Sequence, residues 1–230
     1  MLFGWFYYDW TMLIVLPALL FTIWAQIKVN SSFKKFSGVY TKNGLTGAQA
    51  ARRILDANGL HDVQIERVHG SLTDHYDPRT NTIRLSETVH DVSSVAAVGV
   101  AAHETGHAIQ YAKQYFPIKV RSAIIPVTQI GSYLAMPLFI IGLLLASDPL
   151  ILFGILLYSC ITVFQLITLP VEFNASRRAM QTLESQGILY KDELDGAYSV
   201  LSAAAMTYVA ALAMSLLTLL RLLALANRRR

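Results

Sequence analysis

Cysteine is nearly absent from this chain of 230 residues, which contains only Cys160, inside an apolar run. Such a sequence excludes a disulfide framework, and it also excludes a metal cluster held by several thiolates. Any metal that the chain binds must therefore be held by histidine and carboxylate side chains.

Charged residues are also scarce. They make up 15% of the chain, whereas an ordinary soluble domain contains about 25%. Hydrophobic residues account for 54%, and the mean hydropathy is +0.44. This composition predicts a protein of the lipid bilayer. The net charge is +4, but the basic residues are not clustered with aromatic residues as in RNA- or DNA-binding surfaces, so we expect no nucleic-acid partner.

A secretory signal is missing as well, because residues 1–10 contain neither a basic segment nor a small-residue cleavage site. Their aromatic side chains instead predict a belt at the membrane interface, with core packing as the alternative: Trp5, Tyr7, Tyr8 and Trp10. The apolar run from Thr11 to Ile27 is long enough to cross the hydrocarbon layer. We therefore expect residues 1–27 to form an interfacial segment and a first transmembrane helix.

Residues 28–125 are polar and predict a small folded α+β domain. Thr46 and Gln49 have the pattern of a capping box, which predicts a short helix. Alternating side chains predict three strands, of which the last two form a hairpin: residues 61–68, 71–76 and 82–86. A long helix is expected from about Ser94 to Gln114.

Three more apolar runs follow this polar region. Two of them lie in residues 126–169 and are separated by a short turn, which predicts a transmembrane hairpin. Pro170 is expected to begin a polar helical segment, 170–200. The last apolar run lies in residues 201–230, before a basic tail. The sequence therefore predicts a mainly α membrane protein with about four transmembrane helices and the small α+β domain.

The expected long helix carries the pattern H-E-x-x-H, which is His103-Glu104-Thr105-Gly106-His107 in this chain. Positions i and i+4 lie on one face of a helix, so both imidazoles can face one metal ion. Glu104 stands next to the first histidine, where it can take a proton from a water molecule that the metal activates. The alternative is a helix with two unrelated histidines.

A third metal ligand must come from another part of the chain, and two carboxylates compete for this role. Glu172 is favoured, because the small Ala175 and Ala179 would let the motif helix come close and Ser176 could hydrogen-bond a ligand. Asp195 lies in Leu-Asp-Gly, which resembles the aspartate motif of intramembrane site-2 proteases, but its surroundings are charged. Ordinary roles remain open, as a helix-end charge or a surface charge.

Five segments together resemble the neutral zinc membrane metallopeptidases of the YugP type: LTGAQAARRIL, LTDHYDPRTNTIRLS, VAAHETGHAIQ, LITLPVEFNASRRA and AAAMTYVAA. The resemblance implies a zincin-like domain of the gluzincin type and a zinc endopeptidase. It also implies that His103, His107 and Glu172 bind Zn²⁺ and that Glu104 is the general base.

The order of these motifs is also similar to that in the HtpX and Ste24 membrane zinc proteases. In those families an acidic residue follows the ligand glutamate by four positions, where this chain has Ser176. This difference puts an acidic partner for a ligand histidine in doubt, and Asn174 is a candidate for part of that role.

The reaction also needs a group that stabilises the anionic intermediate, in addition to the metal. His75, Tyr76 and Arg177 are candidates, and each has an ordinary alternative role in the hairpin or at the surface. The polypeptide substrate is expected to bind as an added strand, on either 81–85 or 72–76, unless that strand is internal to the sheet.

Three functions follow from these patterns. A zinc endopeptidase that hydrolyses membrane or misfolded proteins is favoured. A site-2-like intramembrane protease with Asp195 as a ligand is the second. A non-catalytic metal-binding membrane scaffold is the third, and Glu104 argues against it because a structural metal site needs no base.

The distribution of basic residues predicts how the chain crosses the membrane. The segments that follow the first and third spans are basic, with Lys28, Lys34, Lys35, Lys119 and Arg121 close to span ends. The positive-inside rule then places the active site in the cytoplasm, in a chain of the prokaryotic plasma membrane. The arginines after the last apolar run oppose this orientation if that run crosses fully.

Overall fold

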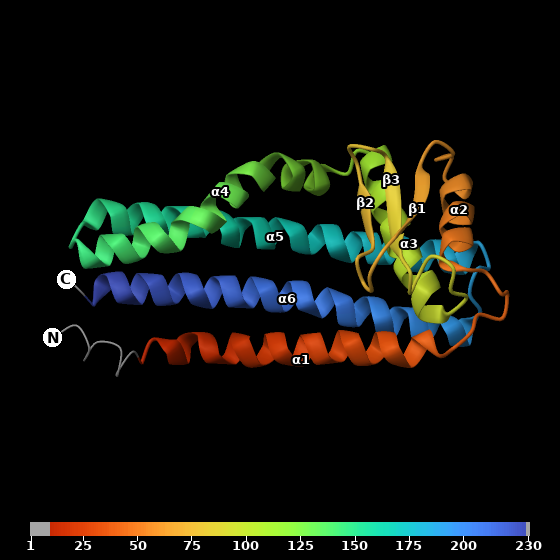
Figure 1. The fold of residues 1–230 in the computed structure, drawn as a ribbon, viewed down its shortest axis with the longest axis horizontal. Helices are drawn as coiled ribbons and strands as arrows, with labels where there is room; N and C mark the ends of the chain where they lie inside the picture. The colour runs from red at the N-terminus through yellow and green to blue at the C-terminus, as the bar shows by residue number, and fades with distance from the viewer. Residues whose placement is uncertain (1–9, 229–230) are drawn as a thin grey trace. The chain divides into compact units, whose positions relative to one another are not determined.

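A computed structural model describes residues 10–228 of the chain. These residues are mostly helical and contain one small sheet (Figure 1). The elements follow in the order α1 (Met12–Ser37), α2 (Gly47–Ala57), β1 (Gln64–Val68), β2 (His75–Asp77), β3 (Thr82–Ser86), α3 (Val95–Ala112), α4 (Phe116–Leu144), α5 (Asp148–Ser185) and α6 (Lys191–Asn227). Of the predicted aromatic belt, Trp5, Tyr7 and Tyr8 lie outside the described residues.

The chain divides into two compact units, and the first contains most of the apolar sequence. It consists of Met1–Ala25, Val120–Leu169 and Thr207–Arg230. The helices α1, α4, α5 and α6 are each long and apolar enough to cross a membrane. The predicted number of transmembrane helices is therefore confirmed by length and composition.

These four helices extend beyond the apolar runs that the sequence defines. The prediction that Pro170 begins a new helix is wrong, because α5 continues through this residue without a break. Proline removes one backbone donor but does not end a helix whose other residues are strong helix formers held by tertiary packing. In the same way, α6 joins the polar piece after Tyr190 and the last apolar run into one helix.

The second unit consists of Gln26–Lys119 and Pro170–Met206 and contains the sheet. The strand order is β1-β3-β2, in which β1 pairs parallel to β3 and β2 pairs antiparallel to it. The predicted hairpin is therefore confirmed. The expectation that residues 81–85 offer a free edge is wrong, because β3 lies between the other two strands. The free edges belong to β1 and β2.

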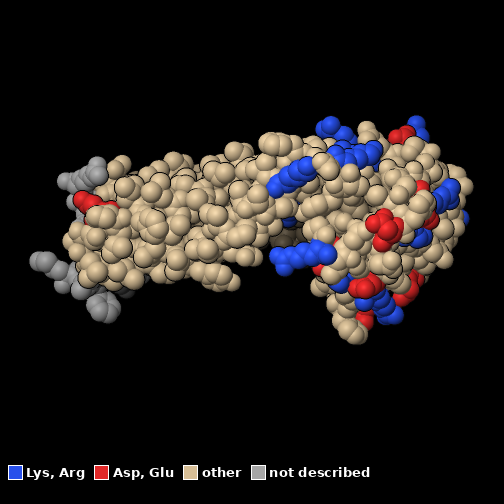
Figure 2. All heavy atoms as spheres, turned by 90° about the horizontal axis from the view of Figure 1, so that it is seen from above, with Lys and Arg blue, Asp and Glu red and all other residues tan. Residues whose placement is uncertain are grey.

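The helix α3 lies in the core of this second unit. Its N-cap is Ser94, whose hydroxyl accepts a hydrogen bond from the amide of Ala97. Small and branched residues of α3 pack against β3 and α2. Ile83 of β3 and Ile54 of α2 are fully buried in this contact. The capping box at the start of α2 is confirmed. Figure 2 shows that charged side chains gather over the second unit, whereas the visible surface of the first unit is almost free of them.

Candidate metal centre

Three side chains from α3 and α5 converge on one point inside the second unit. His103 and His107 come from α3 and Glu172 comes from α5, and their ligand atoms all lie within 4.8 Å of one another. The Oε2 atom of Glu172 lies 3.3 Å from Nε2 of His103 and 3.5 Å from Nε2 of His107. Ligand atoms bound at about 2.1 Å in a tetrahedral zinc site lie about 3.4 Å apart, so this donor set fits such an ion.

The two helices reach this separation because small residues face each other across their contact. A Cβ atom added to Gly106 would lie 2.6 Å from the carbonyl oxygen of Ala175, which is closer than side chains can approach. Ala175 and Ala179 are buried, as the sequence predicts for a face that receives the motif helix. The glycine inside the H-E-x-x-H pattern is therefore the residue that lets the glutamate of α5 reach the histidines of α3.

Each histidine is also held from its other ring nitrogen. Nδ1 of His103 lies 3.1 Å from Oγ of Ser176, so the contact expected of Ser176 is present. Nδ1 of His107 lies 3.0 Å from Oε1 of Gln110. Sequence reasoning does not find Gln110, although its position three residues after His107, on the same helix face, is a usable signal.

Glu104 is buried on α3 between the two histidines in sequence, and its residue is 8% exposed. The negative charge of Glu104 raises the pKa of His107. Burial alone would lower the pKa of His107, but hydrogen bonding to Glu172, the charges of Glu104 and Glu172, and the contact with Gln110 outweigh burial and raise it. The negative charge that favours a proton at this place also favours a cation.

A second acidic group, Asp74, lies within electrostatic range of Glu104. Burial raises the pKa of Asp74, and the charge of Glu104 adds to the effect. Ser86 opposes it by donating two hydrogen bonds to the carboxylate, from its amide at 2.7 Å and from its hydroxyl at 3.0 Å. No sequence pattern singles out Asp74, because its contacts depend on how the loop before β2 packs on β3.

The other predicted site residues are not part of the group of three. His75 is exposed, and its Nδ1 donates to the carbonyl oxygen of Thr73 at 2.9 Å. Arg177 is exposed on α5. Asp195, the alternative ligand, is exposed on α6 and lies outside the metal-ligand group found in residues 10–228. The roles of His75 and Arg177 therefore stay predictions.

Tyr76, the third candidate for stabilising the anionic intermediate, has its hydroxyl engaged. The hydroxyl donates to Oδ1 of Asn81 at 2.8 Å, and the ring packs against the ring of Tyr111, with the centroids 5.6 Å apart. Burial raises the pKa of Tyr76 to about 12. Its ring contact also shows that β2 lies against the half of α3 that follows the histidines.

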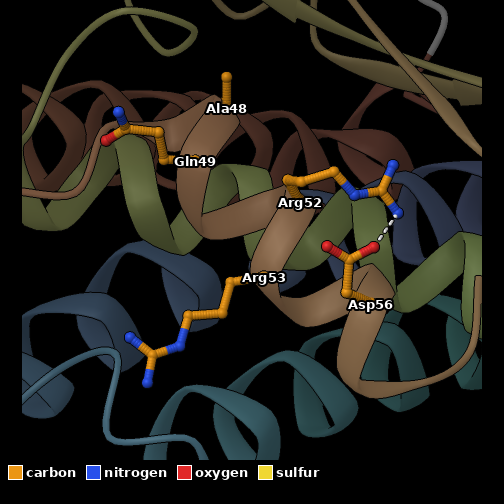
Figure 3. Close-up of a pocket in the computed structure, with 5 residues that line it drawn as sticks. All are labelled: Ala48, Gln49, Arg52, Arg53 and Asp56. Atoms are coloured by element: carbon orange, nitrogen blue, oxygen red, sulfur yellow. Dashed lines mark ion pairs between the residues drawn. The ribbon is translucent and has the colours of Figure 1, made fainter. Parts of the chain in front are cut away.

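A surface hollow on α2 is separate from this group. It is lined by Ala48, Gln49, Arg52, Arg53 and Asp56 (Figure 3). None of these residues belongs to the group of His103, His107 and Glu172. Arg52 forms an ion pair with Asp56, one turn further along α2, at 2.9 Å. Arg52 also donates to the carbonyl oxygens of Leu60 and Val63, so this side chain connects α2 to the following loop.

Comparisons with known proteins cover the whole of this arrangement. The family model described as "Putative neutral zinc metallopeptidase" matches residues 11–227. The chain is 51% identical over 208 residues to "Putative membrane protease YugP" of Bacillus subtilis (strain 168), which covers 90% of this chain and 92% of that protein. No solved structure matches the chain.

The close approach of α3 and α5 can be tested by adding one methyl group at Gly106. We expect Gly106→Ala to push the helices apart, because the new Cβ would meet the backbone of Ala175. The cost in the free energy of unfolding should be about 1–3 kcal/mol, and zinc binding should weaken. Denaturant unfolding of the detergent-purified protein and zinc titration against a chromophoric chelator measure the two effects.

Gly99 offers a matched control on the same helix. A Cβ there would lie 3.4 Å from the Cβ of Ala197, which is ordinary contact. Gly99→Ala should therefore keep zinc affinity and stability. Equal zinc affinities in the two variants would contradict the role given to Gly106.

Proposed function

The chain belongs to the neutral zinc metallopeptidases, a family whose cofactor is zinc, and we propose that it is a membrane-embedded zinc endopeptidase of the gluzincin type. One observation carries this proposal. Two imidazoles and one carboxylate meet with separations that suit zinc, and a buried carboxylate, Glu104, stands next to one of the two histidines. A site that only supports structure would need no such base.

We assign the zinc ion to His103, His107 and Glu172. Bound there, zinc would polarise a peptide carbonyl and lower the pKa of a water molecule to about 7. The three protein ligands leave a fourth position for water and substrate, as catalytic zinc sites do. The contacts at Nδ1 hold both rings with Nε2 towards Glu172, where each Nε2 would be free to bind the metal.

Glu104 is the proposed general base. Its carboxylate takes a proton from the attacking water and later passes that proton to the leaving amine. The developing negative charge on the substrate needs a further donor, and we retain His75 and Arg177 for this role. His75 begins β2, a strand that packs against α3 through the Tyr76 and Tyr111 rings.

The proposed substrate is an extended segment of a membrane or misfolded polypeptide. Such segments commonly bind proteases by adding a strand to a sheet edge. Because β3 is internal, the edge available beside α3 is β2. A peptide paired there would run alongside the helix that carries Glu104, so its carbonyl groups would come within reach of the base.

The competing functions receive less support. A site-2-like mechanism requires Asp195 near the two histidines, but this side chain is exposed on α6 and outside the ligand group. A non-catalytic scaffold does not account for the buried carboxylate of Glu104, because a structural metal site needs no base. For the setting, we propose a prokaryotic plasma membrane with the active site on the cytoplasmic side, since the basic residues near the span ends follow the first and third spans.

The endopeptidase proposal predicts hydrolysis of casein that a chelator abolishes and added zinc restores. Glu104→Gln removes the base but keeps the size of the side chain, so turnover should fall about 100- to 10,000-fold while one zinc stays bound. Metal analysis and peptide release measure the two properties together. Glu184→Gln, on an exposed part of α5, is the control and should retain activity. Full activity in Glu104→Gln, or activity that remains in the presence of the chelator, would contradict the proposal.

The identity of the third ligand predicts opposite results for two carboxylates. Glu172→Ala should weaken zinc binding at least about 100-fold, because a ligand is lost, whereas second-layer changes already cost about 10- to 100-fold. Asp195→Ala should bind zinc as the unmodified protein does. Zinc per chain after gel filtration distinguishes them. Loss of zinc in Asp195→Ala alone would favour the site-2-like mechanism.

The proposed orientation predicts which positions reagents reach from outside the cell. In a variant without Cys160, a cysteine at His61 should react with a membrane-impermeant maleimide only after permeabilisation. A cysteine at Ser147, in the turn between α4 and α5, should react in intact cells, and a cysteine at Asn227 should also react if α6 crosses fully. Reaction at position 61 in intact cells would reverse the orientation. Protection at position 227 alone would show that α6 does not cross fully.

A further inference from the structure

A chain of polar contacts behind His107 connects α3 to α5 without passing through Glu172. Gln110 is fully buried, and its Oε1 lies 3.0 Å from Nδ1 of His107. The Nε2 atom of Gln110 donates to the backbone carbonyl of Val171 at 2.8 Å and to Oδ1 of Asn174 at 3.0 Å. Oδ1 of Asn174 also accepts from Nε of Arg178 at 2.8 Å.

The direction of each hydrogen bond between Arg178 and His107 follows from the arginine, at the end of the series. Arginine has only donors, so the atom of Asn174 that faces Arg178 must be its carbonyl oxygen. The atom of Gln110 that faces the same oxygen must then be its NH₂ group. The carbonyl of Val171, which can only accept, imposes the same orientation on Gln110 independently.

The consequence reaches the imidazole of His107. Gln110 turns its own carbonyl oxygen towards the ring, and this oxygen can only accept a hydrogen bond. Nδ1 of His107 must therefore carry the hydrogen, which leaves a lone pair on Nε2 in the neutral ring. Nε2 is the atom that lies 3.5 Å from Oε2 of Glu172, at the proposed metal position.

We propose that Gln110, Asn174 and Arg178 form a hydrogen-bond relay that fixes the tautomer and ring orientation of His107 for zinc binding. Gln110 is the positioning residue, and the other two hold its amide in one orientation. This proposal rests on the proposed zinc site. It assigns these residues a role that the H-E-x-x-H pattern does not contain.

The two histidines differ in how firmly they are held. The partner of His103 is the hydroxyl of Ser176, which can either donate or accept, so it does not select a tautomer. The relay does select one for His107. The outer end of the relay is itself held, because the Arg178 guanidinium lies over the ring of Tyr115, 5.9 Å from the ring centroid.

Zinc affinity is the measurement that tests the relay. The full chain in detergent is stripped of metal, and zinc is titrated in competition with a chromophoric chelator. Gln110→Met keeps the length of the side chain but removes all three hydrogen bonds. We expect its zinc dissociation constant to rise about 10- to 100-fold, as for other residues that orient a metal ligand.

Two substitutions of Asn174 separate the relay from simple packing. Asn174→Asp keeps the oxygen that accepts from Gln110 and Arg178, so its zinc affinity should stay within about threefold of the unmodified protein. Asn174→Leu removes that oxygen while Val171 still holds Gln110, so we expect a smaller loss than in Gln110→Met, about three- to tenfold. Ser185→Ala is the control, because this exposed hydroxyl on α5 donates to the backbone carbonyl of Thr182, which is not a relay residue.

The outcomes distinguish the relay from the zinc site itself. If the unmodified protein binds no zinc, both proposals fail. If it binds zinc and Gln110→Met binds equally well, or if Asn174→Asp is as weak as Asn174→Leu, the relay alone fails. Unfolding temperatures of the zinc-free variants complete the test. Lower temperatures with unchanged zinc affinity would give Gln110 a purely structural role.

Discussion

The distance between α3 and α5 at Gly106 and Ala175 is the constraint on which the rest of the site depends. Closely packed interiors do not stretch, so the spacing of two helix backbones decides where their side chains meet. With glycine at this point, the carboxylate of Glu172 comes to 3.3 Å and 3.5 Å from the two imidazoles. Gly106, between Glu104 and His107, therefore contributes to the site through the side chain that it lacks.

Around this contact, the protein buries polar groups on both helices. Glu104, Gln110 and Glu172 are buried among alanines and valines. Buried charges are costly unless they have partners, and buried amides need their hydrogen bonds. Glu172 meets this requirement through the imidazoles of His103 and His107, and Gln110 meets it through His107, Asn174 and the backbone carbonyl of Val171. Glu172 and Gln110 are thus connected through His107, which each of them contacts at a different ring nitrogen.

Glu172 and Ser176 are predicted from their sequence surroundings although they meet the histidines only through long-range packing, and the remaining predicted features are set by local geometry. His103 and His107 share a helix face because of their spacing, and the capping box at Thr46 is equally local. What the sequence does not predict depends on distant contacts. The middle position of β3 depends on its parallel pairing with β1, which comes earlier in the chain. The contact between Gln110 and Asn174 forms only when α3 and α5 pack together. The prediction at Pro170 is wrong because proline does not end a helix that continues on both sides of it, as α5 does.

The placement of Glu172 on α5 also has a consequence for biosynthesis. The chain between His107 and Glu172 contains all of α4 and the apolar part of α5. A nascent chain that has made the H-E-x-x-H helix still lacks the carboxylate, and it acquires that group only after both of these apolar segments have been synthesised. The group of three therefore cannot form before Glu172 has been synthesised, so its assembly comes after synthesis of the two apolar segments, which are long and apolar enough to cross a membrane.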